Sequence, residues 1–317
     1  MNLSSHPAIT LRQLWHFVVA AETGTMSEAA RRLHMAPSAI SMSIAELERI
    51  TGAQLCVKRK SKGLTLTSTG HAVFLQARQM LDLADDLVSM SRGERSSVRG
   101  PLTVGCYMPL APTIIPTMLA EFAAQCPHVD VDFVEGYHED LQEQLLDGSI
   151  DAAFLYDLEV SPALQRAPLQ TVAPYVLLPE THPLRSADRI SLRHIAGDPL
   201  IFFDSPPIST RILDVFQGAG QTPNILHRSR SYATVRSLVA SGRGVSVLYQ
   251  HPDQIAPYEG LRVLVKPLEA PVMGVRNPPT VAVAWTRSIR LNARVQAWID
   301  VAVERFAQSA RETAATA

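Results

Sequence analysis

Residues 27–48 read SEAARRLHMAPSAISMSIAELE, a pattern that predicts two short helices joined by a tight turn. Ser27 can accept a backbone N–H as an N-cap, and the residues that follow it have high helix propensity. Pro37 suits the first position of the second helix, because its φ is fixed and its missing N–H would be unpaired there. The interpretation is a helix-turn-helix whose second helix is the candidate recognition helix.

The second helix has two different faces. Ile40, Ile44 and Leu47 recur at i, i+4 and i+7, which turns them toward a core shared with the first helix. The opposite face carries the small or polar residues Ser38, Ser41, Met42 and Ala45. Small hydroxyls near a helix N-terminus can contact phosphates or base edges in a major groove. A plain helical subdomain with a solvated serine face is the competing interpretation.

The flanking segments favour DNA binding. An apolar stripe that starts at Leu11 predicts a helix over 11–22. Downstream, four cations gather just before Gly63: Lys58, Arg59, Lys60 and Lys62. Leu64 and Leu66 then alternate with threonines as in a short strand. A basic hairpin after a recognition helix is typical of a wing, whose cations would lie along the phosphate backbone and supply affinity without sequence information.

Four blocks in this order and spacing resemble the DNA-binding half of a LysR-type transcriptional regulator: TLRQL at 10–14, AARRLH at 29–34, SAIS at 38–41 and GLTLTSTG at 63–70. Later segments fit that family's effector domain, so the resemblance covers nearly the whole chain. It implies a sequence-specific regulator, not an enzyme, whose promoter binding or bending is controlled by a small-molecule effector, with no resident cofactor or metal. The DNA contacts expected are Ser27, Arg31, Pro37, Ser38, Ser41, Met42, Lys58, Arg59, Lys60 and Lys62.

Three positions depart from the family's pattern. Ala36 stands where Ser or Thr is usual, which weakens the N-cap of the recognition helix by about 1 kcal/mol. Cys56 stands where Phe is frequent, and Met42 where Arg is frequent. Methionine cannot donate a bidentate pair to guanine, so we expect this protein to depend more on its wing and on DNA shape.

A long amphipathic helix is predicted directly after Gly70. Phe74, Ala77, Leu81 and Val88 keep one face over about five turns. The helix could pack on its own domain, but its position between two domains favours pairing with a second copy, in a homodimer or homotetramer. Paired recognition helices would read a partly palindromic site. Residues 89–100 read as a flexible hinge.

From Pro101 onward, strands and helices alternate, which predicts mostly parallel sheets covered by helices. The fold class is therefore α/β: an N-terminal all-α winged helix-turn-helix over 8–70, a linker helix and hinge over 71–100, and an effector domain over 101–317. That domain resembles a two-lobed periplasmic-binding-protein fold. Lobe I is expected over about 101–173 and 268–306, and lobe II over about 174–267, with the final helix packed on lobe I.

A small effector is expected in the cleft between the lobes, where the carboxyl ends of strands meet. The candidates follow the predicted strands: Cys106, Tyr107, Met108, Asp157, Phe203, Asp204, Ser205 and Tyr249. Ordinary loop polarity is the alternative for each of them. Ser205 favours a carboxylate, whereas Asp157 and Asp204 favour a cation or a hydroxylated or amide-bearing ligand. With the aromatic surface added, an amphipathic small metabolite is expected.

Composition agrees with a two-part cytoplasmic regulator. Residues 1–70 carry a net charge of +4 and the remainder −5, which suggests different partners for the two parts. No apolar run of membrane-spanning length and no signal peptide are present. The three cysteines have no CxxC spacing, which argues against a disulfide framework or a zinc site, and nucleophile-elbow, P-loop and HExxH motifs are missing. Two alternatives stay open: a redox-responsive regulator using Cys106, and a small-molecule binding protein without a role on DNA.

Overall fold

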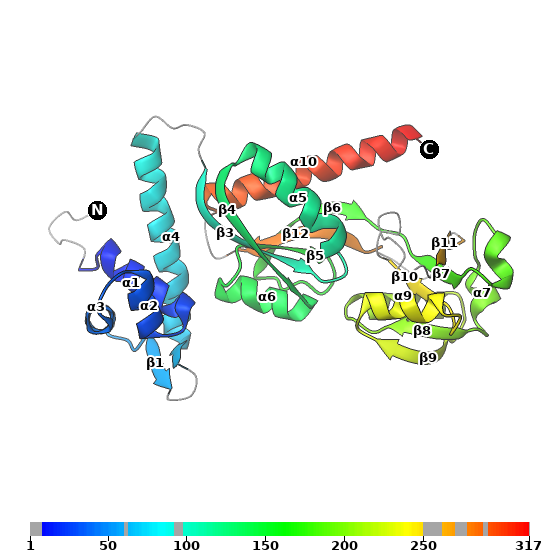
Figure 1. The fold of residues 1–317 in the computed structure, drawn as a ribbon, viewed down its shortest axis with the longest axis horizontal. Coiled ribbons are helices and arrows are strands. Elements are labelled where there is room, and N and C mark those ends of the chain that lie inside the picture. Colours follow the sequence, from blue (N-terminus) through cyan, green and yellow to red (C-terminus); the bar gives the residue numbers. More distant parts are fainter. Residues whose placement is uncertain are drawn as a thin grey trace.

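A computed structural model describes residues 8–59, 63–91, 98–249, 262–269, 278–287 and 291–316. Figure 1 shows three parts in a row: an N-terminal helical unit with the long helix α4, a first α/β lobe, and a second, smaller lobe. The N-terminal unit has a core of its own, because the buried residues before Leu81 form one cluster. The buried residues from Leu102 onward form a second cluster, which the two lobes share. The two-part organisation expected from the sequence is therefore confirmed.

The N-terminal unit consists of α1 (Leu11–Thr23), α2 (Met26–Arg32), α3 (Pro37–Thr51) and a hairpin of β1 (Cys56–Arg59) and β2 (Gly63–Leu66). Its core includes Phe17, Ile40 and Leu47, none of which reaches solvent. The prediction of Ser27 as the cap of α2 was wrong. The Thr25 hydroxyl accepts the backbone N–H of Glu28 at 3.1 Å, which starts the helix at Met26 and leaves Ser27 exposed inside its first turn.

Helix α4 is longer than predicted and runs over Ser68–Ser91. It begins inside the segment that the sequence assigned to the wing, because the Thr67 hydroxyl accepts the backbone N–H of Gly70 at 2.9 Å. The predicted hinge over 89–100 is also too long. Helix α4 includes residues 89–91 and strand β3 already begins at Arg99, while residues 92–97 lie outside the described part of the chain.

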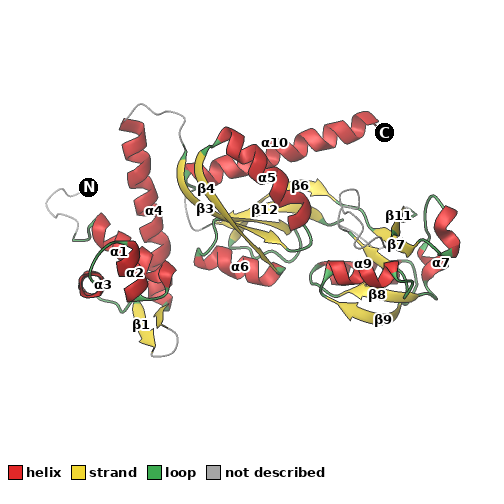
Figure 2. Ribbon diagram, in the orientation of Figure 1, coloured by secondary structure: helices red, strands yellow, loops and turns green. Residues whose placement is uncertain are grey.

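Lobe I is built on a five-stranded sheet in the order β4-β3-β5-β12-β6. Its strands are β3 (Arg99–Tyr107), β4 (His128–Gly136), β5 (Ala152–Tyr156), β6 (Leu164–Thr171) and β12 (Thr280–Thr286). Helices α5 (Ala111–Gln125) and α10 (Ala293–Thr316) cover one face and α6 (His138–Asp147) the other, as Figures 1 and 2 show. Strands β3, β4 and β5 are parallel as expected, but β12 runs antiparallel to both neighbours.

Lobe II has an antiparallel sheet, β10-β7-β11, beside a parallel pair, β8-β9. Its strands are β7 (Tyr175–Pro179), β8 (Pro199–Phe203), β9 (Asn224–Ser229), β10 (Ser246–Leu248) and β11 (Val263–Pro267). Its helices are η1 (Pro183–Ser186), α7 (Leu192–Ile195), α8 (Ile208–Gly218) and α9 (Tyr232–Ala240). The expectation of a mostly parallel sheet is wrong for this lobe, because its central strand β7 pairs with two strands that both run against it.

The chain crosses between the lobes twice, after β6 and before β12. Strand β12 completes the sheet of lobe I, and α10 then packs on α5, β3 and β6 of the same lobe. The final helix thus packs on lobe I, as the sequence predicted, although it extends ten residues beyond the predicted end at 306. No helix within the described ranges is both long and apolar enough to cross a membrane.

Candidate functional sites

The N-terminus of α3 presents a polar, accessible face. Pro37 and Ser38 are exposed, Ser41 is half-buried, and the Met42 side chain is 69% exposed. Ala36 makes no side-chain capping hydrogen bond, so the backbone N–H groups of the first turn depend on other partners. A helix N-terminus of this kind, with small hydroxyls beside it, is suited to an anion such as a phosphate group.

Two hydrogen bonds to the Glu48 side chain and one backbone hydrogen bond hold the hairpin beside α3. The Glu48 carboxylate accepts the backbone N–H groups of Leu55 and Cys56, at 2.7 and 3.0 Å, which ties β1 to the recognition-helix candidate. On the other strand, the Leu64 N–H donates to the Gly24 carbonyl at 2.7 Å. Gly63 is required at this approach, because a Cβ there would lie 2.4 Å from the Gly24 oxygen.

The predicted cations differ in what surrounds them. Arg31 is exposed and donates to the carboxylate of Glu28, and the nearby Arg32 pairs with Glu22 at 3.4 Å. Lys58 and Arg59 belong to strand β1, opposite Leu64 and Gly63. Lys60 and Lys62 lie outside the described residues. Because β1 carries two cations and is tied to α3, this strand can lie along a polyanion.

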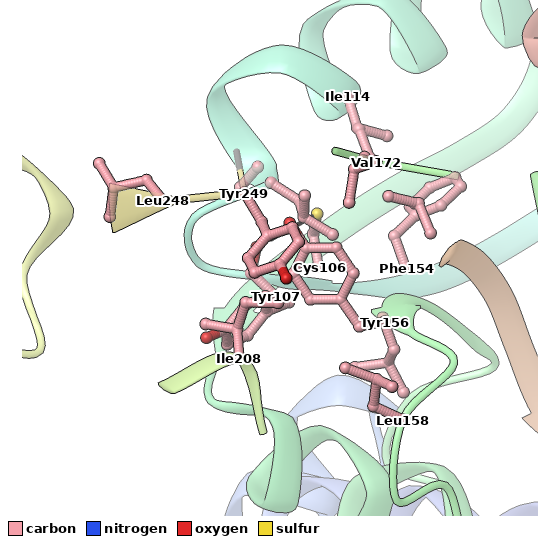
Figure 3. Close-up of a cluster of buried hydrophobic side chains, with 14 of the residues drawn as sticks. Cys106, Tyr107, Ile114, Phe154, Tyr156, Leu158, Val172, Ile208, Leu248 and Tyr249 are labelled. Carbon is pink, nitrogen blue, oxygen red and sulfur yellow. Dashed lines mark hydrogen bonds between the residues drawn. The ribbon is translucent and has the colours of Figure 1, made fainter. Parts of the chain in front are cut away.

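Between the lobes, two of the predicted cleft residues meet. Tyr107 ends β3 in lobe I, and Ser205 follows β8 in lobe II. The Tyr107 hydroxyl donates to the Ser205 Oγ at 2.7 Å, and both residues are fully buried. Phe203 and Tyr249 are buried in the same core, and Figure 3 shows Tyr249 beside Tyr107. The structure therefore brings Tyr107, Ser205 and Tyr249 to one place.

The other predicted cleft residues have different surroundings. Cys106 points into the core of lobe I, where burial raises the pKa of its thiol well above the usual value. Met108 is 36% exposed. The Asp157 carboxylate pairs with Arg166 at 2.5 Å, and that of Asp204 pairs with Arg228 at 3.4 Å. Each of these two carboxylates is therefore already paired with an arginine.

Sequence reasoning missed three tyrosines of this region. Tyr156 ends β5, one residue before Asp157, and its ring makes an edge contact with Tyr107 at 5.8 Å between centroids. Tyr175 begins β7, and its hydroxyl lies 2.8 Å from that of Tyr232 on α9. Tyr156 is the last residue of β5, so the rule that selected Asp157 from its place after a strand passed over the residue directly before it.

Burial keeps these phenols protonated, because it raises the pKa values of Tyr107, Tyr156, Tyr175 and Tyr249 above their ordinary range. Their hydroxyls therefore remain hydrogen-bond donors at neutral pH. Burial acts on His138 in the opposite direction and lowers its pKa. Its Nε2 donates to the Tyr156 carbonyl at 2.9 Å, and its Nδ1 accepts from Gln142 at 3.0 Å, so the neutral ring uses both nitrogens.

Two sets of contacts join α4 to lobe I. Arg78 donates to the Gly148 carbonyl and to Asp151 Oδ1, the latter at 2.8 Å, while Asp151 Oδ2 accepts the Thr103 N–H at 2.9 Å. Further along the helix, Asp82 accepts from Asn292 at 2.7 Å and also from Arg294. The helix that follows the DNA-binding candidate is thus fixed to lobe I through side chains at the ends of α6 and α10.

Elsewhere, a hollow of about 100 Å³ lies between α5 and α10, lined in part by Thr117 and Phe306. Its charged residue Arg305 is paired with Glu121 at 3.0 Å. The hydroxyls of Tyr107 and Ser205 meet between the two lobes instead, which makes this region the stronger candidate for a ligand. Within the described ranges, no group of three or more His, Cys, Asp or Glu side chains could hold a metal ion.

Comparisons with known proteins agree on both halves of the chain. Residues 11–71 match the family model "Bacterial regulatory helix-turn-helix protein, lysR family", and residues 95–307 match "LysR substrate binding domain". A probable hydrogen peroxide-inducible genes activator of Mycobacterium leprae is 28% identical, over 80% of this chain and 81% of its own length.

Two similar solved structures come from Pseudomonas aeruginosa. The LysR family regulator HinK is 30% identical, with a TM-score of 0.61, covering 94% of this chain and 98% of HinK. A full-length OxyR variant is 26% identical, with a TM-score of 0.75, covering 95% of each chain.

Proposed function

The chain belongs to the LysR family of bacterial transcriptional regulators, and from this membership we propose how its own residues divide the work. The N-terminal unit holds promoter DNA, and the two lobes bind a small molecule that changes this grip. The protein acts as a homodimer or homotetramer, in the cytoplasm where its DNA target lies, and has no enzymatic activity. The observation that carries the proposal is the pairing of a fixed basic hairpin with an accessible α3 N-terminus.

On DNA, α3 enters the major groove with Ser38, Ser41 and Met42 toward the bases. Pro37 leaves the helix N-terminus open toward a phosphate, and Ser27 and Arg31 approach the backbone from α2. The wing residues Lys58, Arg59, Lys60 and Lys62 follow the phosphates and supply most of the affinity. Because Met42 offers no hydrogen bond to guanine, sequence preference at its position depends on apolar contact and DNA shape.

The effector occupies the interlobe cleft, with Tyr107, Ser205 and Tyr249 as its nearest predicted contacts. Met108, Phe203, Asp157 and Asp204 surround this position more distantly, and Cys106 supports it from the core. Binding shifts the two lobes relative to each other, and lobe I transmits the shift to α4 through Arg78 and Asp82. A coupling of about 1–3 kcal/mol is sufficient to change promoter occupancy or bending.

A redox-responsive regulator is the second candidate, because the Mycobacterium leprae relative is a probable hydrogen peroxide-inducible activator. The chemistry of this chain opposes it. Reactive thiols are exposed and have lowered pKa values, whereas Cys106 is fully buried and burial raises its pKa. Lobe II has no cysteine over residues 174–267 that could form a disulfide within that lobe.

DNA binding is tested with Arg59→Ala and Ser38→Ala in the full-length chain. Arg59→Ala should weaken binding to promoter and competitor DNA alike and reduce the slope of log affinity against log salt by roughly one. Ser38→Ala should change the ratio of promoter to competitor affinity, since its contact depends on sequence. Fluorescence anisotropy over a salt series measures both quantities.

Arg49→Ala is the matched control, because Arg49 is exposed on the same helix but at its C-terminal end, paired with Glu46. It should leave both the affinity and the salt dependence unchanged. If Arg59→Ala behaves like Arg49→Ala, the wing does not hold the backbone. If Ser38→Ala lowers all affinities equally, α3 does not read the sequence.

A further inference from the structure

The outer face of helix α3 carries a large apolar side chain in contact with solvent. Met42 is 69% exposed, whereas Ile40 and Ile44 on the inner face of the same helix are 0% and 2% exposed. Ser38 lies one turn before Met42 and Ala45 one turn after it, and both are exposed as well. The face that α3 turns toward DNA in the proposed function is therefore apolar at its centre.

Helix α3 lacks the side chains that recognise purines by paired hydrogen bonds. Asn, Gln and Lys do not occur over Pro37–Thr51, and Arg49 is the only arginine. The Arg49 guanidinium donates to both carboxylate oxygens of Glu46, at 2.8 and 2.6 Å, near the C-terminus of the helix. The second acid of the helix, Glu48, accepts two backbone N–H groups of the hairpin. Bidentate recognition of guanine or adenine therefore has no suitable side chain on the outer face of α3.

The feature of a base pair that fits an apolar side chain is the methyl group of thymine. Every base presents donors or acceptors in the major groove, but only thymine adds an apolar group there, at its C5 atom. Contact between Met42 and this methyl group would remove apolar surface of both from water. A methionine side chain is flexible and polarizable, so it can adapt to the irregular floor of the groove. Serine hydroxyls accept from and donate to several bases and discriminate less.

We propose that α3 recognises thymine through its methyl group and that Met42 is the residue that determines this preference. The proposal rests on the proposed function, since it names the feature of DNA that the same helix reads. Each half-site bound by this chain carries a T·A pair opposite Met42. An arginine at this position, which is frequent in the family, would donate a bidentate pair to guanine instead, so Met42 changes the base that is preferred.

The methyl contact is tested on duplexes that the full-length protein selects from a random library. Each thymine of the selected site is replaced in turn by deoxyuridine, which removes the methyl group and keeps every hydrogen-bonding group. At one thymine of each half-site the affinity should fall about fourfold, the loss expected for one buried methyl group. Fluorescence anisotropy at a fixed salt concentration measures the affinities. Unchanged affinity after every replacement overturns the proposal.

Met42→Ala assigns the methyl contact to its residue. The variant should stay folded, because Met42 is exposed and alanine favours helices, and its melting temperature checks this. It should no longer distinguish the thymine duplex from the deoxyuridine duplex. Met42→Leu, which keeps a large apolar side chain, should restore the difference. Met35→Ala is the matched control, because Met35 is exposed in the turn before α3, and it should keep the full difference. A full difference in Met42→Ala overturns the proposal.

A 5-methylcytosine duplex separates the methyl group from the base pair that carries it. At the identified position, a pair of 5-methylcytosine with guanine should bind the natural protein more tightly than the unmethylated C·G pair. Met42→Ala should bind the two duplexes equally. Equal binding by the natural protein would mean that α3 reads another property of the T·A pair, such as its effect on DNA shape, and would overturn the proposal.

Failure of this inference differs from failure of the proposed function. If the library yields no enriched sequence, the chain has no sequence preference, and the proposed function fails together with this inference. If a sequence is enriched but its methyl groups do not affect binding, the proposed function stands and the role of Met42 is wrong.

Discussion

At the scale of single residues, His138 connects the start of helix α6 to the end of strand β5 in lobe I. Its neutral ring donates to the carbonyl of Tyr156 at the end of β5, while Gln142 donates to its other nitrogen. The Gln142 amide is fixed in turn, because its Oε1 accepts the Ser161 N–H at 2.7 Å. The ring cannot bind a second proton without losing the contact with Gln142. Protonation of His138 therefore opposes the folded arrangement.

We expect acid to destabilise the protein through this residue. Burial lowers the pKa of His138 below its ordinary value of 6.5, so below that pH the unfolded chain binds a proton that the folded chain does not. The stability that neutral His138 contributes is complete above pH 6.5 and is lost as the pH falls toward the folded-state pKa. His138→Gln, which retains a donor and an acceptor, should lose less stability between pH 7.5 and 5.5 than the natural protein.

Urea unfolding at the two pH values measures this difference. His71→Gln is the control, because His71 is exposed on α4, and it should keep the pH dependence of the natural protein. Identical losses in His138→Gln and the natural protein would contradict the prediction and assign the acid sensitivity to other groups, such as the buried His16, whose pKa burial also lowers.

At the scale of elements, α4 connects the N-terminal unit to lobe I. The Arg78 guanidinium lies between the N-terminal unit and the α6–β5 turn, and its partner Asp151 is also bound by the Thr103 N–H. Asp82 repeats the arrangement one turn later with Asn292 and Arg294. Because Arg78 and Asp82 lie one turn apart, their contacts oppose both the rotation of α4 about its axis and its sliding along that axis.

Arg78→Met should loosen α4 from lobe I without unfolding either unit. Methionine keeps much of the aliphatic stem, but it loses hydrogen bonds to a carboxylate and a carbonyl, worth roughly 1.5–3 kcal/mol in local stability. Hydrogen exchange of the α4 amides should become about tenfold faster or more, as a change of this size implies. Gln76→Ala, an exposed position on the same helix, is the control. Equal exchange in both variants would mean that Arg78 does not fix the helix.

Some elements could be predicted from the sequence because their pattern is local. Helix α3 begins at Pro37 as expected. Helix α8 begins just after Pro207, and its buried residues Ile208, Ile212 and Val215 have helical spacing. Strand β6 has a weaker signal, since most of its residues are partly or fully exposed and do not alternate.

The cleft was predictable only in part, and for a physical reason. The ends of parallel strands meet, so Tyr107 and Ser205 could be chosen from the sequence, and their hydrogen bond joins them. The Tyr175–Tyr232 contact depends on how α9 packs on β7, which no local pattern specifies. The ion pair of Asp157 likewise depends on Arg166, which lies in strand β6, and the sequence did not predict that strand.

At the scale of the whole molecule, polar contacts between described residues help to hold the two lobes together. The Tyr107–Ser205 hydrogen bond is buried, and Arg230 of lobe II stacks on Tyr137 of lobe I. Ser205→Ala should favour the open state, because the Tyr107 hydroxyl loses its closest acceptor. Hydrogen exchange at the ends of β3 and β8 should rise severalfold in the unliganded protein, while the core strand β7 keeps its protection.

Ser241→Ala tests the specificity of that effect, since Ser241 is an exposed serine of the same lobe whose hydroxyl contacts only its own helix among the described residues. Its exchange pattern should match that of the natural protein. If Ser205→Ala matches it too, the closed state does not depend on the Tyr107 contact, and the lobes are held by apolar burial alone.

The strands of lobe II, β7 through β11, come from one continuous run of chain, whereas lobe I is assembled from segments on both sides of that run. The polypeptide therefore enters lobe II once and leaves it once. The residues that hold α4 through Arg78 and Asp82 lie in lobe I, outside this run. Recombination or gradual substitution within this insert can retune which metabolite is recognised and leave the attachment to the promoter-reading unit unaltered. Because the two lobes share one buried cluster, such substitutions must stay compatible with lobe I where the lobes touch, whereas positions of lobe II away from that contact are free to vary.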